Sequence, residues 1–140
     1  MVTIAESPFV DRLRADLGTA ERGNLFDADC PTRQILDRIS DKWTALVVLL
    51  LADGPMRFTE LRTHLGRVAP KVLTQSLRRL ERDGLVTREI FAEVPPRVEY
   101  TLTELGHSLA GPIAVIGDWA EAHLSRVIAA QEAYDAARGG

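Results

Sequence analysis

The residues with the clearest chemical potential lie between positions 70 and 83. Leu73, Leu77 and Leu80 follow the i, i+4, i+7 spacing of one helix face. The other side of such a helix carries Lys71, Gln75, Arg78 and Arg82, with Thr74 at its edge. Ammonium and guanidinium groups bind phosphates, while amide and hydroxyl groups hydrogen-bond the edges of bases. This segment therefore indicates a surface that contacts a nucleic-acid duplex.

Within that surface, the order along the helix predicts which side chains do what. In a helix-turn-helix the N-terminal residues of the second helix reach the bases. We therefore expect Lys71, Thr74 and Gln75 to contact bases or nearby phosphates. Arg78 and Arg79, further along, are expected to contact the phosphate backbone. The alternative is an exposed helix whose charges are merely solvated, and the elements around the helix decide between the two.

The helices and strands around this helix can be predicted in order along the chain. Residues 58–65 predict a short helix ended by Gly66, and Pro70 starts the next helix, which Gly84 ends. The hydrophobic period then changes from 3.6 to 2, so residues 85–91 and 97–102 are expected to be strands. Residues 92–96 are too few for a helix and must connect them as a hairpin. The fold class predicted is mainly α with a small two-stranded β-hairpin wing, a winged helix-turn-helix.

The tip of the wing carries one candidate site residue. Pro95 and Pro96 restrict the backbone there and stiffen the hairpin, and Arg97 follows them. The Arg97 guanidinium could contact a phosphate or the minor groove of DNA, or it could form an ion pair with an acid such as Glu93. The sequence leaves both roles open.

Three regions follow from this pattern. Residues 1–29 are expected to be an N-terminal extension with a short helix and a loop, and residues 30–104 the winged helix-turn-helix core. In that core, a helix after Pro31 should turn Ile35, Leu36 and Ile39 inward, and the apolar run 43–52 should be the central helix. Residues 105–140 are expected to form C-terminal helices for dimerisation, with a break at Gly111-Pro112.

The C-terminal region predicts a homodimer. Its second apolar stripe is more than a lone winged-helix domain needs, and unpaired it would leave an exposed patch. Two-fold symmetry then predicts double-stranded DNA with a pseudo-palindromic operator as the ligand. The expected interface residues are Ile113, Ile116, Trp119, Ala120, His123, Leu124 and Val127.

Cys30 is the single cysteine, and it precedes Pro31 at a predicted helix N-terminus. Unpaired N–H groups and the helix dipole favour a thiolate there, which would allow redox or electrophile sensing. The other interpretation is a small packed residue that never reacts. An intrachain disulfide is excluded, because the chain has no second cysteine.

Composition and charge limit the function classes. Hydrophobic residues make up 46% of the 140 residues and charged residues 26%, as in ordinary globular proteins. The net charge is -3, yet residues 57–97 hold nine Arg and Lys against five acids, a local balance of +4. The three histidines lie far apart, so we expect neither a metal site nor a cofactor. The longest apolar run is about half a membrane span and the N-terminus lacks a signal-peptide pattern, which predicts no membrane association and a cytoplasmic protein.

Several motifs in the same order resemble the HxlR family of MarR-like winged-helix regulators. They are Cys30-Pro31, ISDKW at 39–43, RFTEL at 57–61, KVLTQ at 71–75, LRRL at 77–80, DGLV at 83–86, VPPRVEY at 94–100, Leu102-Thr103, Gly106 and Trp119. The resemblance implies a dimer with a recognition helix in each major groove and wings on flanking DNA. Some members of that family use a cysteine at the position of Cys30 as a sensor. Ala69 departs from the serine that the family often carries there, which removes an N-cap hydroxyl worth about 1 kcal/mol.

The sequence favours a sequence-specific transcriptional regulator over two other function classes. A thiol enzyme built on Cys30 would need a histidine and an aspartate held beside it, and nothing in the sequence sets that geometry; we expect no enzyme. A winged helix that binds only proteins is the remaining alternative. Steep loss of duplex binding with salt would separate the two, because phosphate contacts release counterions. Whether a small-molecule effector exists stays open.

Overall fold

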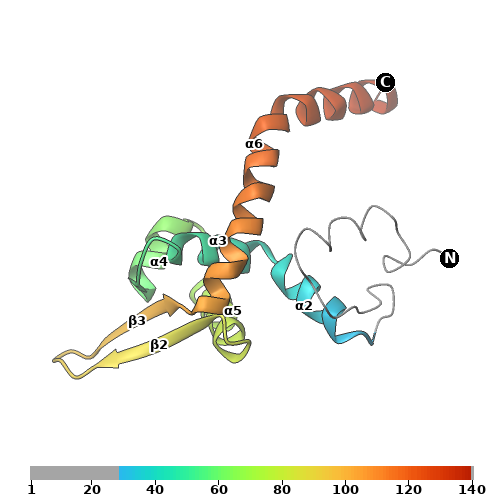
Figure 1. Ribbon diagram of the computed structural model, residues 1–140. Helices are drawn as coiled ribbons and strands as arrows, with labels where there is room; N and C mark the ends of the chain where they lie inside the picture. Colours follow the sequence, from blue (N-terminus) through green and yellow to red (C-terminus); the bar gives the residue numbers. More distant parts are fainter. Residues whose placement is uncertain (1–28, 140) are drawn as a thin grey trace. The chain divides into compact units, whose positions relative to one another are not determined.

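The computed structural model describes residues 29–139 (Figure 1). The helix and loop expected within residues 1–29 fall outside the described residues, except for Asp29. The chain divides into two compact units, Met1–Thr44 and Ala45–Gly140. The elements are α2 Pro31–Ile39, α3 Lys42–Leu51, β1 Met56–Arg57, α4 Phe58–Leu65, α5 Pro70–Arg82, β2 Val86–Phe91, β3 Arg97–Leu102 and α6 Glu104–Gly139.

The first unit contains α2 and the start of α3. As predicted, Pro31 occupies the first turn of α2, directly after Cys30 at the N-cap. The Asp41 carboxylate accepts hydrogen bonds from the backbone N–H and the hydroxyl of Thr44, at 3.1 and 3.2 Å, and so caps α3. The expected inward face of α2 was wrong for Ile35 and Leu36, which are 44% and 46% exposed, whereas Ile39 is half-buried. Periodicity identified the amphipathic helix but not a surface that covers it.

The core of the second unit is aliphatic. Val47, Val48 and Leu51 of α3 are no more than 1% exposed, which confirms the apolar run as a core helix. The other elements of this unit except β1 also contribute buried residues, namely Leu61 of α4, Leu73, Leu77 and Leu80 of α5, Val86 of β2, Leu102 of β3 and Ile113 of α6. Burial of this apolar surface is the main stabilising contribution to the unit.

The sheet has three antiparallel strands in the order β1-β3-β2, one more than predicted. The hairpin itself is confirmed, with Val86 opposite Leu102 and Phe91 opposite Arg97. The added strand β1 pairs Met56 with Tyr100 and Arg57 with Glu99. A strand of two residues has no alternation to detect, so periodicity could not find it. Figure 1 shows β2 and β3 extending away from α5 and α6 as the wing.

The C-terminal region forms one helix, α6, and not the two helices expected from a break at Gly111-Pro112 (Figure 1). Pro112 lies inside α6, where it removes one hydrogen bond to the carbonyl of Ser108. Ser108 and Pro112 are both exposed, so water can solvate that carbonyl. Ile113 is 6% exposed and fixes the helix to the core directly after the proline. Packing therefore outweighs the local preference to stop.

A compact junction joins α5, the wing and α6. The N–H of Leu85 donates to the Leu80 carbonyl at 2.9 Å and that of Gly84 to the Glu81 carbonyl at 3.1 Å, the two bonds of a Schellman motif. Gly84 takes the positive φ of 76° that this motif requires. The Thr103 hydroxyl donates to the Gly84 carbonyl at 2.6 Å and accepts from the Gly106 N–H at 3.0 Å. It thereby caps α6 and fixes α6 to the end of α5.

Candidate nucleic-acid interface

The helices α4 and α5 are joined by a short turn, as a helix-turn-helix requires. Gly66 ends α4 with a φ of 76°, and the buried Val68 fixes the turn to the core. Ala69 is the N-cap of α5 and makes no side-chain cap hydrogen bond, as expected for an alanine at this position. Pro70 supplies the first helical residue.

The two sides of α5 differ as the sequence predicted. Leu73, Leu77 and Leu80 are at most 2% exposed, and the small Ser76 is buried beside them. The opposite side is open to solvent and carries Lys71, Gln75, Arg78, Arg79 and Arg82. The apolar side holds the helix rigidly on the core, so the polar side is presented in a fixed orientation.

Thr74 lies at the edge of this surface and is half-buried. Its hydroxyl donates a hydrogen bond to the Pro70 carbonyl at 2.8 Å. The hydroxyl oxygen keeps lone pairs that can accept from a base amino group, but its proton is already engaged. Gln75, one residue further on, is exposed and offers both a donor and an acceptor.

The wing sheet has two faces with different side chains. Because strand residues alternate, cross-strand partners share a face with the residues two positions away. Arg88 and its partner Tyr100 lie on one face, and Glu99 and Arg97 lie on the other. Thr74 and Leu77 of α5 line a cavity together with Arg88 and Tyr100, so α5 lies on the Arg88 face.

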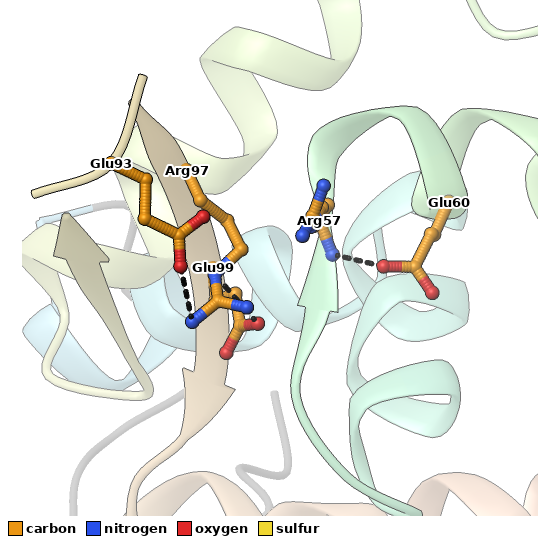
Figure 2. A network of polar contacts seen from close by, with 5 residues as sticks. All are labelled: Arg57, Glu60, Glu93, Arg97 and Glu99. Carbon is orange, nitrogen blue, oxygen red and sulfur yellow. Dashed lines mark hydrogen bonds and ion pairs between the residues drawn. The ribbon is translucent and has the colours of Figure 1, made fainter. Parts of the chain in front are cut away.

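On the opposite face, Arg97 is held within the wing (Figure 2). Its guanidinium lies 3.3 Å from a carboxylate oxygen of Glu93 and 3.6 Å from one of Glu99. It also covers the ring of its strand partner Phe91 at 4.2 Å, a cation–π contact. Of the two roles that the sequence left open, the structure shows the ion pair with Glu93. A contact of Arg97 with DNA stays a prediction.

Two residues next to the candidate surface were not found from the sequence, Arg88 and Tyr100. Arg88 forms an ion pair with Glu81 of α5 at 3.8 Å. Burial raises the pKa of the Tyr100 hydroxyl, while Arg88 and Arg78 act in the opposite direction. Tyr100 therefore stays protonated and able to donate. Alternation along 85–91 indicated which residues share a face, but only the structure shows which face α5 covers.

The predicted dimer residues fall mostly on one exposed stripe of α6. Ile116, Trp119, Leu124 and Val127 are 67%, 59%, 57% and 41% exposed. The ring of His123 stacks on Trp119 with centroids 4.6 Å apart, and Ala120 is exposed. Ile113 differs: it is buried within the single chain, so its assignment to the interface was wrong. At the base of α6 the same apolar periodicity serves the chain's own core.

Cys30 is buried, at 9% exposure, and its carbonyl accepts the first helical hydrogen bond of α2 from the Gln34 N–H at 3.2 Å. Within residues 29–139, no group of His, Cys, Asp and Glu side chains is arranged to hold a metal ion. No helix of that same range is long and apolar enough to cross a membrane.

Comparison with known proteins shows which family and which relatives this chain resembles. The model of the HxlR-like helix-turn-helix family matches residues 38–128. The HTH-type transcriptional regulator YtfH of Escherichia coli (strain K12) is 40% identical over 112 residues, which are 80% of this chain and 89% of that protein. The HTH-type regulator YdeP of Bacillus subtilis (strain 168) is 42% identical over 98 residues, 70% of this chain and 77% of the relative.

Solved structures show the same fold. The transcriptional regulator ytfH from Salmonella typhimurium superposes with a TM-score of 0.75 at 42% identity, covering 79% of this chain and 99% of that chain. The redox regulator HypR in its reduced form superposes with a TM-score of 0.66 at 36% identity, covering 71% and 98%. The family model, which matches residues 38–128, reaches from the end of α2 into α6 and so includes the candidate surface.

Proposed function

Because this chain belongs to the HxlR-like helix-turn-helix family of transcriptional regulators, we propose that it binds a pseudo-palindromic operator as a homodimer. In this proposal α5 enters the major groove, and the protein works in the cytoplasm with the DNA. The carrying observation is the division of α5 between buried leucines and an exposed side with Lys71, Gln75 and Arg78. Such a rigid basic side supplies backbone and base contacts together.

Two variants of α5 test this proposal. Gln75→Ala should weaken operator binding by about 1 to 3 kcal/mol and relax the preference at one base pair, because an amide contact to a base carries sequence information. Arg78→Ala should weaken binding to all sequences alike and flatten the salt dependence, because a phosphate contact does not read sequence. Operators selected from random duplexes and titrated by fluorescence anisotropy provide the measurement. Unchanged binding by both variants, with the fold intact, contradicts the assignment.

The homodimer rests on the exposed side of α6. Trp119, His123 and Val127 follow one another at helical spacing and form a shallow, mainly apolar groove with Ala130, which Arg126 borders. The groove continues along Val127, Ala130 and Tyr134, with Gln131 and Asp135 at its border. The polar residues Asp118, Glu121 and Ser125 fall on the opposite side of the same helix. A second copy of α6 is the occupant that two-fold symmetry supplies, since the same apolar surface then covers itself.

A narrower proposal concerns regulation through Cys30. The solved relatives include the redox regulator HypR in its oxidized form, 40% identical, and YodB from B. subtilis after diamide treatment, 31% identical. Cys30 stands at the N-cap of α2, where the helix dipole favours a thiolate. We propose that oxidation or alkylation of Cys30 changes operator affinity. The test compares wild type with Cys30→Ser, as set out in the Discussion.

The wing enters the proposal through stiffness. Arg97 connects Glu93 near the tip, Glu99 in the central strand and the ring of Phe91. These contacts join the tip of the hairpin to both of its strands. We therefore propose that Arg97 affects DNA affinity indirectly, through the wing. Removing an indirect effect leaves the salt dependence of DNA binding unchanged, whereas removing a direct phosphate contact reduces it.

A further inference from the structure

A small cavity lies between α5 and the wing. Its lining residues come from three elements: Thr74, Leu77, Arg78 and Glu81 from α5, Arg88 from β2 and Tyr100 from β3. Its volume is about 200 Å³, more than a phosphate group needs. Arg78 and Thr74 belong to the surface already assigned to DNA. Arg88 and Tyr100 lie next to that surface and had no assigned role.

The cavity carries an excess of positive charge. Arg78 and Arg88 face a single carboxylate, that of Glu81, which lies 3.8 Å from the Arg88 Nε. Both partners of that pair are about half exposed, with side-chain exposures of 50% for Arg88 and 41% for Glu81. An ion pair of that kind contributes little to stability, so an incoming anion can replace it at small cost. With two guanidinium groups and one carboxylate, the cavity has one positive charge in excess, and this charge attracts the anion.

The donors around the cavity suit a phosphate oxygen. The two guanidinium groups supply planar N–H pairs that match phosphate geometry. The Tyr100 hydroxyl carries its proton at neutral pH, as an ordinary tyrosine does, and can donate to the anion. The Thr74 hydroxyl is committed to the Pro70 carbonyl and offers no proton, so it borders the cavity without binding the anion. Donors thus come from α5 and from both long strands of the wing.

We propose that this cavity binds one phosphate of the DNA backbone, with Arg88 moving from Glu81 to the phosphate and Arg78 and Tyr100 completing the site. In the free protein the Glu81 carboxylate takes the place of the phosphate and keeps the Arg88 guanidinium beside α5. The inference rests on the proposed DNA binding and adds the wing residues that α5 alone does not supply. It also assigns the backbone contact of the wing to the Arg88 face of the sheet, not to the Arg97 face.

The experiment measures binding of the full chain to a fluorescein-labelled duplex of random sequence over a range of salt concentrations. Each lost phosphate contact reduces the slope of log K against log salt by about 0.9. Arg88→Ala should reduce the slope by up to about 0.9, since Arg78 still faces the same phosphate, and should bind up to about tenfold more weakly near 0.1 M salt. Tyr100→Phe should weaken binding several-fold, and Glu81→Gln should strengthen it several-fold because the competing carboxylate is gone. The matched control is Arg138→Ala, which removes the same charge at the far end of α6, where the Arg138 guanidinium donates to the Tyr134 hydroxyl and lies over the Tyr134 ring. Because Tyr134 lines the groove proposed for the dimer, sedimentation equilibrium first checks that this control still dimerises.

The outcomes separate this inference from the function on which it rests. Wild type that fails to bind any duplex overturns the proposed function itself. If wild type loses duplex affinity steeply with salt and Arg88→Ala has the same slope, only the phosphate site is overturned. A second arm adds inorganic phosphate at constant ionic strength and follows the thermal midpoint. Stabilisation of wild type but not of Arg88→Ala, with equal duplex slopes, would assign the cavity to a free anion and overturn the DNA contact.

Discussion

The variant Ile116→Asp tests whether the apolar side of α6 forms the dimer interface, and the size of its effect follows from the exposure of Ile116. Ile116 is 67% exposed in the single chain. Full burial of an isoleucine side chain contributes about 1.5 to 3 kcal/mol, so covering two-thirds of it contributes roughly 1 to 2 kcal/mol. A two-fold axis uses the residue twice, which doubles this to roughly 2 to 4 kcal/mol. At 1.4 kcal/mol per decade, loss of this term alone weakens the dimer by about two orders of magnitude.

Sedimentation equilibrium over a range of micromolar concentrations measures that change, and operator binding is measured on the same samples. Because Ile116 is exposed in the protomer, the variant should keep its helical signal while both dimerisation and operator affinity fall. Ser125→Asp introduces the same charge on the opposite side of α6 and should leave both unchanged. Wild-type dimerisation by Ile116→Asp, or an equal loss in Ser125→Asp, would refute the assignment of this side of α6 to the interface.

Two further predictions concern the wing and the thiol. Arg97→Ala should lower the thermal midpoint and reduce duplex affinity modestly without changing the salt slope, because it removes the contacts to Glu93, Glu99 and Phe91; a slope reduced by about 0.9 would instead establish a direct phosphate contact. Diamide should change wild-type operator affinity by about 5- to 150-fold and leave Cys30→Ser unaffected, since serine keeps the size without the thiolate. A Cys30–Cys30 cross-link across the dimer would further require Cα atoms within about 7 Å, and mass spectrometry separates it from a mixed disulfide or adduct. Equal affinity of wild type before and after treatment would make Cys30 a packing residue.

Sequence periodicity predicted the parts of the fold in which local pattern and packing agree. The leucine spacing of α5, the flanking Pro70 and Gly84, and the change to period two in the wing all match the structure. Each of these signals states which side of an element is apolar, and the core then covers that side.

The differences arise where packing outweighs the local signal or where no local signal exists. Pro112 predicts a stop, but the burial of Ile113 holds α6 continuous through it. The apolar stripe that includes Ile113 does not indicate which of its residues pack in the core of the protomer and which are exposed. Ile35 and Leu36 show the same ambiguity, because an apolar face in sequence is exposed in the single chain.

The candidate site shows a similar division. The residues of α5 were predictable because one helix carries them all. Arg88 and Tyr100 come from two strands and reach α5 only through the register of the hairpin and the side on which α5 packs. Neither is encoded in a local pattern. The role of Arg97 was open for the same reason, since Glu99 reaches its guanidinium by strand alternation.

The central claim, that the exposed side of α5 binds duplex DNA through its backbone and bases, is tested most directly by a salt titration of wild type and Arg78→Ala. Both are titrated against the selected operator and against a random duplex. We predict a steep loss of wild-type affinity with salt on both duplexes, tighter binding to the operator, and a slope reduced by up to about 0.9 for Arg78→Ala on both. Weak, salt-independent binding that does not distinguish the two duplexes would contradict it and favour a winged helix that binds protein.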